Sequence, residues 1–82
     1  MPRVGDWVKI REIPPWVHEL DLPDVQQIYA YAVGRTFQVK GIDDAGKLEL
    51  WLFPPENPFG KQVDVLHVDP IYTDLVASPP ES

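Results

Sequence analysis

The strongest constraint on the fold of this chain is a change in hydrophobic period that follows Gly34. Residues 35–43 (RTFQVKGID) and residues 47–53 (KLELWLF) alternate apolar and polar side chains, which is the pattern of half-buried β-strands. The intervening DDAGK contains aspartates, which favour turns, and a glycine that can adopt a positive φ. Residues 35–53 are therefore predicted to form a β-hairpin.

The period-two alternation also assigns side chains to the two faces of the sheet. In the hairpin, the side chains predicted to point inward are Phe37, Val39, Leu48, Leu50 and Leu52. Glu49 and Trp51 are predicted to point outward. A first strand over Asp6–Ile13 would place Val8 and Ile10 inward. The outward side chains of that strand would be Trp7, Lys9 and Arg11.

A pair of prolines and one helix signal mark the first long connection. Pro14-Pro15 ends the first strand, because proline lacks the amide that a strand ladder needs, and a loop is predicted from there to about Leu22. Asp21 is a candidate N-cap, Pro23 suits a first helical turn, and Gly34 suits the position after a helix end. The apolar stripe between them is Val25, Ile28, Tyr29 and Ala32. One short helix is predicted here.

The C-terminal part of the chain predicts two more strands. Residues 54–60 are too rich in proline for a strand, whereas residues 61–69 (KQVDVLHVD) read as a fourth strand. Its two sets of apolar side chains are out of phase, which predicts a β-bulge or burial on both faces. Residues 69–76 (DPIYTDLV) predict a single 3₁₀ turn and a last strand. We expect one domain over residues 1–77 and a flexible tail over residues 78–82.

Five short strands in 82 residues predict a small closed or partly open barrel, because closure removes exposed sheet edges. The order GDWVKI, long loop, FQVKGIDDAGKLELWL and VDVLHVDPIYTDLV resembles a bacterial SH3-like barrel over about residues 4–77. The resemblance implies a mainly β, five-stranded SH3-like barrel. The helix in the first long connection is a departure from several members of this group.

Within this superfamily the chain is similar to small accessory barrels. These include the β-subunit domain of nitrile hydratase, the variable chain of ferredoxin–thioredoxin reductase and the stromal barrel subunit of photosystem I. Such barrels pack against a catalytic or redox partner and are not catalysts alone. The resemblance therefore implies a non-catalytic protein-interaction or accessory module with a larger protein partner. We expect the chain itself to be a monomer or a weak homodimer.

Composition narrows the functional classes. The chain has no cysteine, so disulfides and thiolate metal sites contribute nothing, which fits a cytoplasmic protein. No apolar run approaches the roughly 18 residues of a membrane-spanning helix, so no membrane partner is expected. The formal net charge of −6 has the opposite sign to the basic footprint of nucleic-acid-binding proteins. Weak nucleic-acid binding through Lys9, Arg11 and Lys40 remains a second alternative.

No motif for catalysis or cofactor binding stands out. His18 and His67 lack the spacing of metal ligands. Asp43-Asp44 falls in the predicted turn, where adjacent aspartates act as turn formers. The two serines, Ser78 and Ser82, lie in the predicted tail, which argues against a serine nucleophile. We therefore expect no catalytic residue, no cofactor and no metal. The first functional alternative is a barrel subunit of a multi-chain enzyme complex.

The aromatic side chains are the candidate partner-binding residues. Exposed aromatic side chains mark interfaces, and SH3-like folds bind ligands in aromatic-lined grooves. The candidates are Trp7, Trp16, Trp51, Phe59 and Tyr72. The predicted docking surface combines the loop Pro14–Leu22, the outward face of the first strand and the turn Pro70–Asp74. The alternative is that these rings cap the open ends of a small barrel.

Overall fold

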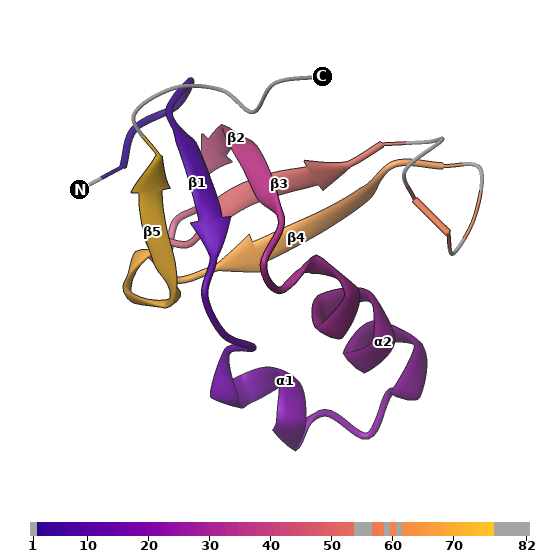
Figure 1. The fold of residues 1–82 in the computed structure, drawn as a ribbon. Coiled ribbons are helices and arrows are strands. Elements are labelled where there is room, and N and C mark those ends of the chain that lie inside the picture. The colour runs from indigo at the N-terminus through magenta and orange to yellow at the C-terminus, as the bar shows by residue number, and fades with distance from the viewer. Residues whose placement is uncertain (1, 54–56, 59, 61, 77–82) are drawn as a thin grey trace.

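The computed structural model describes residues 2–53, 57–58, 60 and 62–76. Five antiparallel strands form one sheet in the order β4-β3-β2-β1-β5, accompanied by two α-helices and a 3₁₀ turn (Figure 1). The elements are β1 (Trp7–Ile10), α1 (Pro15–Glu19), α2 (Pro23–Ala32), β2 (Thr36–Ile42), β3 (Leu48–Leu52), β4 (Asp64–Val68), η1 (Pro70–Tyr72) and β5 (Thr73–Val76). The prediction of a mainly β fold with five strands is confirmed.

Strand β2 is shared between two halves of the sheet. Its first residues, Thr36–Gln38, pair with β1, and pairing with β3 begins at Val39. The register shifts between Val39 and Gly41, so Lys40 is the extra residue of a β-bulge. A bulge bends the strand and increases its twist, and β2 can therefore leave β3 and turn towards β1. β4 and β5 form the two ends of the sheet in the described part of the chain.

The core lies between the inward face of the sheet and the two helices (Figure 1). The inward assignments made from alternation are confirmed, because those strand side chains are buried. The buried apolar residues are Val8, Ile10, Val17, Tyr29, Ala32, Phe37, Val39, Leu48, Leu50, Leu52, Leu66 and Val68. Tyr29 also ties α2 to β4: its hydroxyl accepts a hydrogen bond from His67 N at 3.0 Å.

The first long connection contains two helices, so the prediction of a single helix preceded by a loop is wrong. The segment predicted as a loop forms α1, which begins at Pro15 and buries Val17. A five-residue helix is too short to show a 3.6-residue period, and tertiary contacts stabilise it. The Gln26 side chain in α2 supplies one such contact, because it donates hydrogen bonds to the backbone oxygens of Val17 and Leu20.

The ends of α2 differ in how well the sequence predicts them. Asp21 is not the N-cap; that position is Leu22, and no side chain caps the helix. Pro23 occupies the first turn as predicted, where its missing amide leaves no helical hydrogen bond unmade. Gly34 has φ +84°, which confirms the predicted left-handed residue after the helix end. The four-residue apolar stripe faces the core, with Tyr29 and Ala32 fully buried and the others partly buried.

The predicted irregularity in the fourth strand is wrong. β4 pairs with β3 without interruption, from Leu48 opposite Val68 to Leu52 opposite Asp64. Its apolar residues do not share one environment: Leu66 and Val68 are buried, whereas Val65 is exposed. The out-of-phase pattern therefore reflects an exposed valine on the outward face. The predicted hairpin turn and the 3₁₀ turn before β5 are both confirmed.

Candidate functional site

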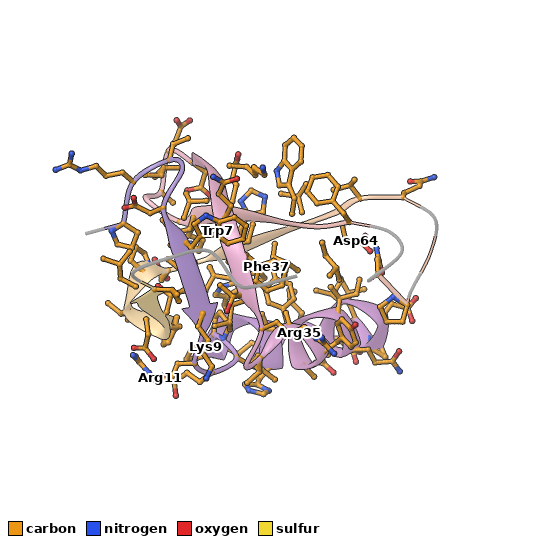
Figure 2. All side chains as sticks on the ribbon, turned by 45° about the horizontal axis from the view of Figure 1, so that its top comes forward. Trp7, Lys9, Arg11, Arg35, Phe37 and Asp64 are labelled. Atoms are coloured by element: carbon orange, nitrogen blue, oxygen red, sulfur yellow. The ribbon has the colours of Figure 1, made fainter. Side chains whose placement is uncertain are left out.

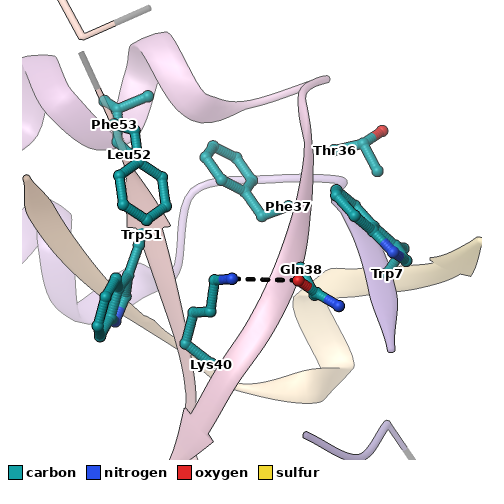
Figure 3. A pocket seen from close by; sticks show the side chains of 8 residues that line it. All are labelled: Trp7, Thr36, Phe37, Gln38, Lys40, Trp51, Leu52 and Phe53. Carbon is teal, nitrogen blue, oxygen red and sulfur yellow. Dashed lines mark hydrogen bonds between the residues drawn. The ribbon is translucent and has the colours of Figure 1, made fainter. Parts of the chain in front are cut away.

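A groove of about 350 Å³ opens on the outward side of the sheet, between β1 and the end of β3 (Figure 3). Its lining residues are Trp7, Thr36, Phe37, Gln38, Lys40, Trp51, Leu52 and Phe53. They come from β1, β2, β3 and the residue that follows β3. The groove thus draws on segments that are far apart in the sequence.

The path of β2 explains why the groove exists. Pairing between β2 and β3 ends at Val39 opposite Leu50, whereas Thr36–Gln38 pairs with β1 alone. The end of β3 from Trp51 onward therefore pairs with β4 alone and separates from β2. The groove is the space between β2 and the end of β3. The bulge at Lys40 lies where these two strands separate.

The backbone of β2 offers hydrogen-bonding groups to this groove. Ile10 N donates to Arg35 O, and Val39 N donates to Asp6 O, so odd-numbered residues of β2 bond towards β1. In an antiparallel pair, bonding residues alternate with residues whose backbone groups point the other way. The N–H and C=O groups of Thr36 and Gln38 therefore face away from β1, on the side of the groove.

Two exposed aromatic rings form one wall. Trp51 is 40% exposed and Phe53 is 42% exposed. Their ring centroids are 5.7 Å apart with an interplanar angle of 54°. That separation lies in the range where aromatic pairs attract each other, so the two rings support each other's position. Trp7 lines the groove beyond Gln38, away from this pair (Figure 3).

Lys40 is the one charged side chain among the described residues that line the groove. Its ammonium group donates to Gln38 Oε1 at 3.1 Å and lies 5.8 Å from the centroid of the Phe53 ring (Figure 3). Gln38 is itself fixed, because its Nε2 donates to Gly5 O at 3.1 Å. The groove therefore presents an oriented cation between apolar walls.

The structure brings two of the five predicted partner-binding residues together. Trp7 and Trp51 both line the groove. Trp16 packs on Tyr29 in a T-shaped pair with centroids 5.4 Å apart, and its indole Nε1 is buried without a hydrogen-bond partner. Tyr72 is partly buried against the core. Phe59 lies outside the described residues. Partner binding by all five stays a prediction.

Six of the eight groove residues are absent from the predicted site, and among them Phe53 and Lys40 provide an aromatic ring and the charge. Phe53 falls two positions after Trp51, so extending the outward alternation by one step would have identified it. Lys40 had no such signal, because its position in the groove depends on the bulge. Gly41 directly after it is a weak indication, since glycine inside a strand often marks a bulge.

Three basic side chains, Lys9, Arg11 and Arg35, lie near β1, and Lys9 is exposed (Figure 2). Arg11 Nη1 donates to Asp74 Oδ1 at 2.8 Å, and its Nη2 donates to Ile71 O. Arg35 stacks on the Tyr31 ring, with 3.8 Å between the guanidinium carbon and the ring centroid. Of the three cations named for nucleic-acid binding, Arg11 is paired with an acid, whereas Lys9 is exposed and Lys40 lines the groove, so that alternative stays a prediction.

A second polar cluster joins the hairpin turn to β4. Asp43 Oδ1 accepts hydrogen bonds from Ala45 N and Lys47 N, each at 2.9 Å, and Oδ2 lies 3.0 Å from His67 Nδ1. These contacts lower the pKa of Asp43, chiefly through Lys47 N–H, with further contributions from His67 and Ala45. The cluster orders the turn. Among the described residues, no group of three histidine, cysteine or acidic side chains could hold a metal ion.

The lowered pKa of Asp43 gives a pH-dependent prediction. The stabilisation from its carboxylate is complete above the unfolded pKa of about 4 and is lost as the pH falls through the lower folded pKa. Asp43→Asn, which retains an acceptor oxygen for the turn, should flatten the loss of stability below about pH 4. Urea denaturation at pH 2–6 measures this, with Asp44→Asn as the neighbouring control. An unchanged acid slope in Asp43→Asn would contradict the assignment.

No helix within the described ranges is both long and apolar enough to cross a membrane. Comparison of the chain with family models, curated proteins and solved structures found no match in any of the three. The site must therefore be interpreted from its own geometry.

Proposed function

We propose that this chain is a non-catalytic protein-interaction module that docks on a larger protein through the groove lined by Trp7, Lys40, Trp51 and Phe53. The observation that carries the proposal is the exposed Trp51–Phe53 pair at the wall of a groove of about 350 Å³. Exposing two large rings side by side leaves apolar surface in water, and such surfaces mark interaction sites. Tryptophan is also among the residues that contribute most to binding energy at interfaces.

We further propose that the fold is an SH3-like barrel. Three features support this: β2 is shared between β1 and β3, β5 lies on the other side of β1, and a 3₁₀ turn directly precedes β5. The bulge at Lys40 bends the shared strand, as closure of a small barrel requires. On this proposal the two helices fill the first long connection.

The proposed ligand is an extended apolar segment of the partner that carries a carboxylate. Its backbone would bond to the N–H and C=O groups of Thr36 and Gln38, in the manner of strand addition. Apolar side chains would contact Trp51 and Phe53. The carboxylate would pair with Lys40, because the described residues that line the groove include this cation and no acidic side chain. A catalytic subunit that supplies such a segment would make the module part of an enzyme complex.

The proposal is tested by selection from a random peptide library displayed on phage. Wild-type protein should enrich peptides that combine an apolar or aromatic residue with a nearby acid. Binding of the selected peptide should weaken roughly 30-fold in Trp51→Ala, which corresponds to about 2 kcal/mol, a typical loss for a central interface residue. Lys40→Gln should weaken binding less, and more so at low salt than at high salt. Isothermal titration calorimetry measures both.

The matched control is Leu22→Ala, which removes an equally exposed apolar side chain before α2. Leu22→Ala should bind the selected peptide like the wild type, and circular dichroism should show that all variants are folded. Failure to enrich any peptide, or equal affinity in Trp51→Ala and wild type, would contradict docking through the groove.

A further inference from the structure

The two edge strands of the sheet, β4 and β5, differ in whether other described residues bond to their outer backbone groups. At the β4 end, the Tyr29 hydroxyl accepts from His67 N at 3.0 Å and donates to His67 O at 3.5 Å. Helix α2 thereby satisfies the outward backbone groups at the middle of β4. At the other end, β5 pairs with β1 alone, and no described residue lies beyond it in the sheet (Figure 1). An uncovered edge strand is a template for pairing with another strand.

The hydrogen-bond alternation identifies which groups of β5 are exposed on this edge. Arg11 N donates to Tyr72 O at 2.8 Å, and the same register places Val8 opposite Leu75. Since bonded and non-bonded pairs alternate, the backbone N–H and C=O of Leu75 point away from β1. Thr73 N is used within the 3₁₀ turn, where it donates to Pro70 O. Among the described residues of this edge, Leu75 therefore offers the one complete donor–acceptor pair.

The side chains at this edge are unusually apolar for an uncovered strand. Leu75 is 63% exposed and Ile71 is 67% exposed, although Val8 opposite Leu75 is fully buried. Natural edge strands are protected by charged side chains or proline that discourage pairing. β5 has one charged side chain, Asp74, and Arg11 neutralises it at 2.8 Å. Nothing at the described edge thus opposes a neighbouring strand.

We propose that this edge pairs with the same edge of a second copy of the chain, antiparallel and centred on Leu75. In this register the two Leu75 residues exchange both backbone hydrogen bonds, and their exposed side chains lie beside each other. Asp74 of each copy faces Val76 of the other, so no like charges stand directly opposite. The pairing is two-fold symmetric, which closes the assembly at a dimer.

A partner strand of unrelated sequence is less well supported than a second copy. In the self-paired register, the backbone N–H and C=O of Leu75 in one copy bond to those of Leu75 in the other. It also places an apolar side chain against an identical one. The interface is small, because β5 has four residues, and its area falls well below that of stable interfaces. Each copy carries a net charge of −6, so salt should strengthen the dimer by screening the repulsion between them.

Cysteine cross-linking tests the register, because the natural chain contains no cysteine. In the proposed dimer the two positions 75 lie about 5.5 Å apart between Cα atoms, which suits a disulfide. Leu75→Cys should therefore form a disulfide dimer at least tenfold faster than Ile71→Cys under the same oxidised glutathione. Ile71→Cys is the matched control, because Ile71 is similarly exposed but lies in η1, before β5, and would therefore be much farther from its symmetry mate than Leu75.

Sedimentation equilibrium supplies a second measurement that needs no cysteine. Between about 0.02 and 1 mM, the weight-average mass of the wild type should rise from monomer towards dimer, as expected for a small interface. Leu75→Lys should remain monomeric, whereas Leu22→Lys, with the same change of charge away from the edge, should associate like the wild type. Equal cross-linking rates at positions 75 and 71, or a monomeric wild type at 1 mM, would overturn the proposal. Neither result bears on the groove.

Discussion

Replacing Leu50 by alanine is expected to lower the free energy of unfolding by about 2–5 kcal/mol. Leu50 has no exposed surface and lies at the middle of β3, opposite Val39 and Leu66. Both neighbouring strands hold it in place, so the site cannot collapse easily around the missing atoms. Because small domains are stabilised by only about 5–15 kcal/mol, this one change removes a large share of the total.

Urea denaturation followed by circular dichroism measures the effect. The matched control is Val65→Ala, which truncates an exposed apolar side chain in the adjacent strand β4. It should change the free energy of unfolding by no more than about 0.5 kcal/mol, as other surface substitutions do. Similar losses in Leu50→Ala and Val65→Ala would mean that the inward and outward faces of the sheet are assigned wrongly.

Replacing Tyr29 by alanine should destabilise the protein by about 3–5 kcal/mol, the range for large buried aromatic residues. The ring is 5% exposed and packs edge-on against Trp16, and burial raises the pKa of its hydroxyl. Its loss would leave a cavity between α2 and β4. It would also leave His67 N without its hydrogen-bond acceptor.

Tyr29→Phe separates the contribution of the ring from that of the hydroxyl. It keeps the packing on Trp16 but removes both hydrogen bonds to the His67 backbone, and should destabilise by about 1–3 kcal/mol. Amide hydrogen exchange at His67 should also become faster in this variant. If Tyr29→Phe were as stable as the wild type, with unchanged exchange at His67, the hydroxyl would have no part in covering the edge of β4.

The strands were predictable because their pattern is local. Alternation over β2 and β3 places Phe37, Val39 and Leu50 inward, and each of them is buried. The short helix α1 was not predictable, because five residues hold barely one turn and its stabilising contact, from Gln26, lies outside it. Hydrophobic periodicity detects an element only where it is long enough for apolar side chains to recur on one face.

The bulge shows a second limit of the sequence pattern. Out-of-phase valines predicted it in β4, but it lies at Lys40 in β2, beside Gly41. A bulge depends on which strands a segment pairs with, and β2 changes partner at this point. Because the groove depends on this change of partner, the sequence predicted only part of it, namely that Trp51 lies on the outward face. That Trp7 lines the same groove follows from the path of β2.

The proposed docking groove is tested most directly by the indole N–H signals of the three tryptophans. A ¹⁵N-labelled sample titrated with the selected peptide should show large shifts for Trp7 and Trp51, together with the backbone amides of Thr36 and Gln38. The Trp16 signal should stay in place, because that ring packs inward on Tyr29. Shifts at Trp16, with Trp7 and Trp51 unmoved, would contradict docking through the groove.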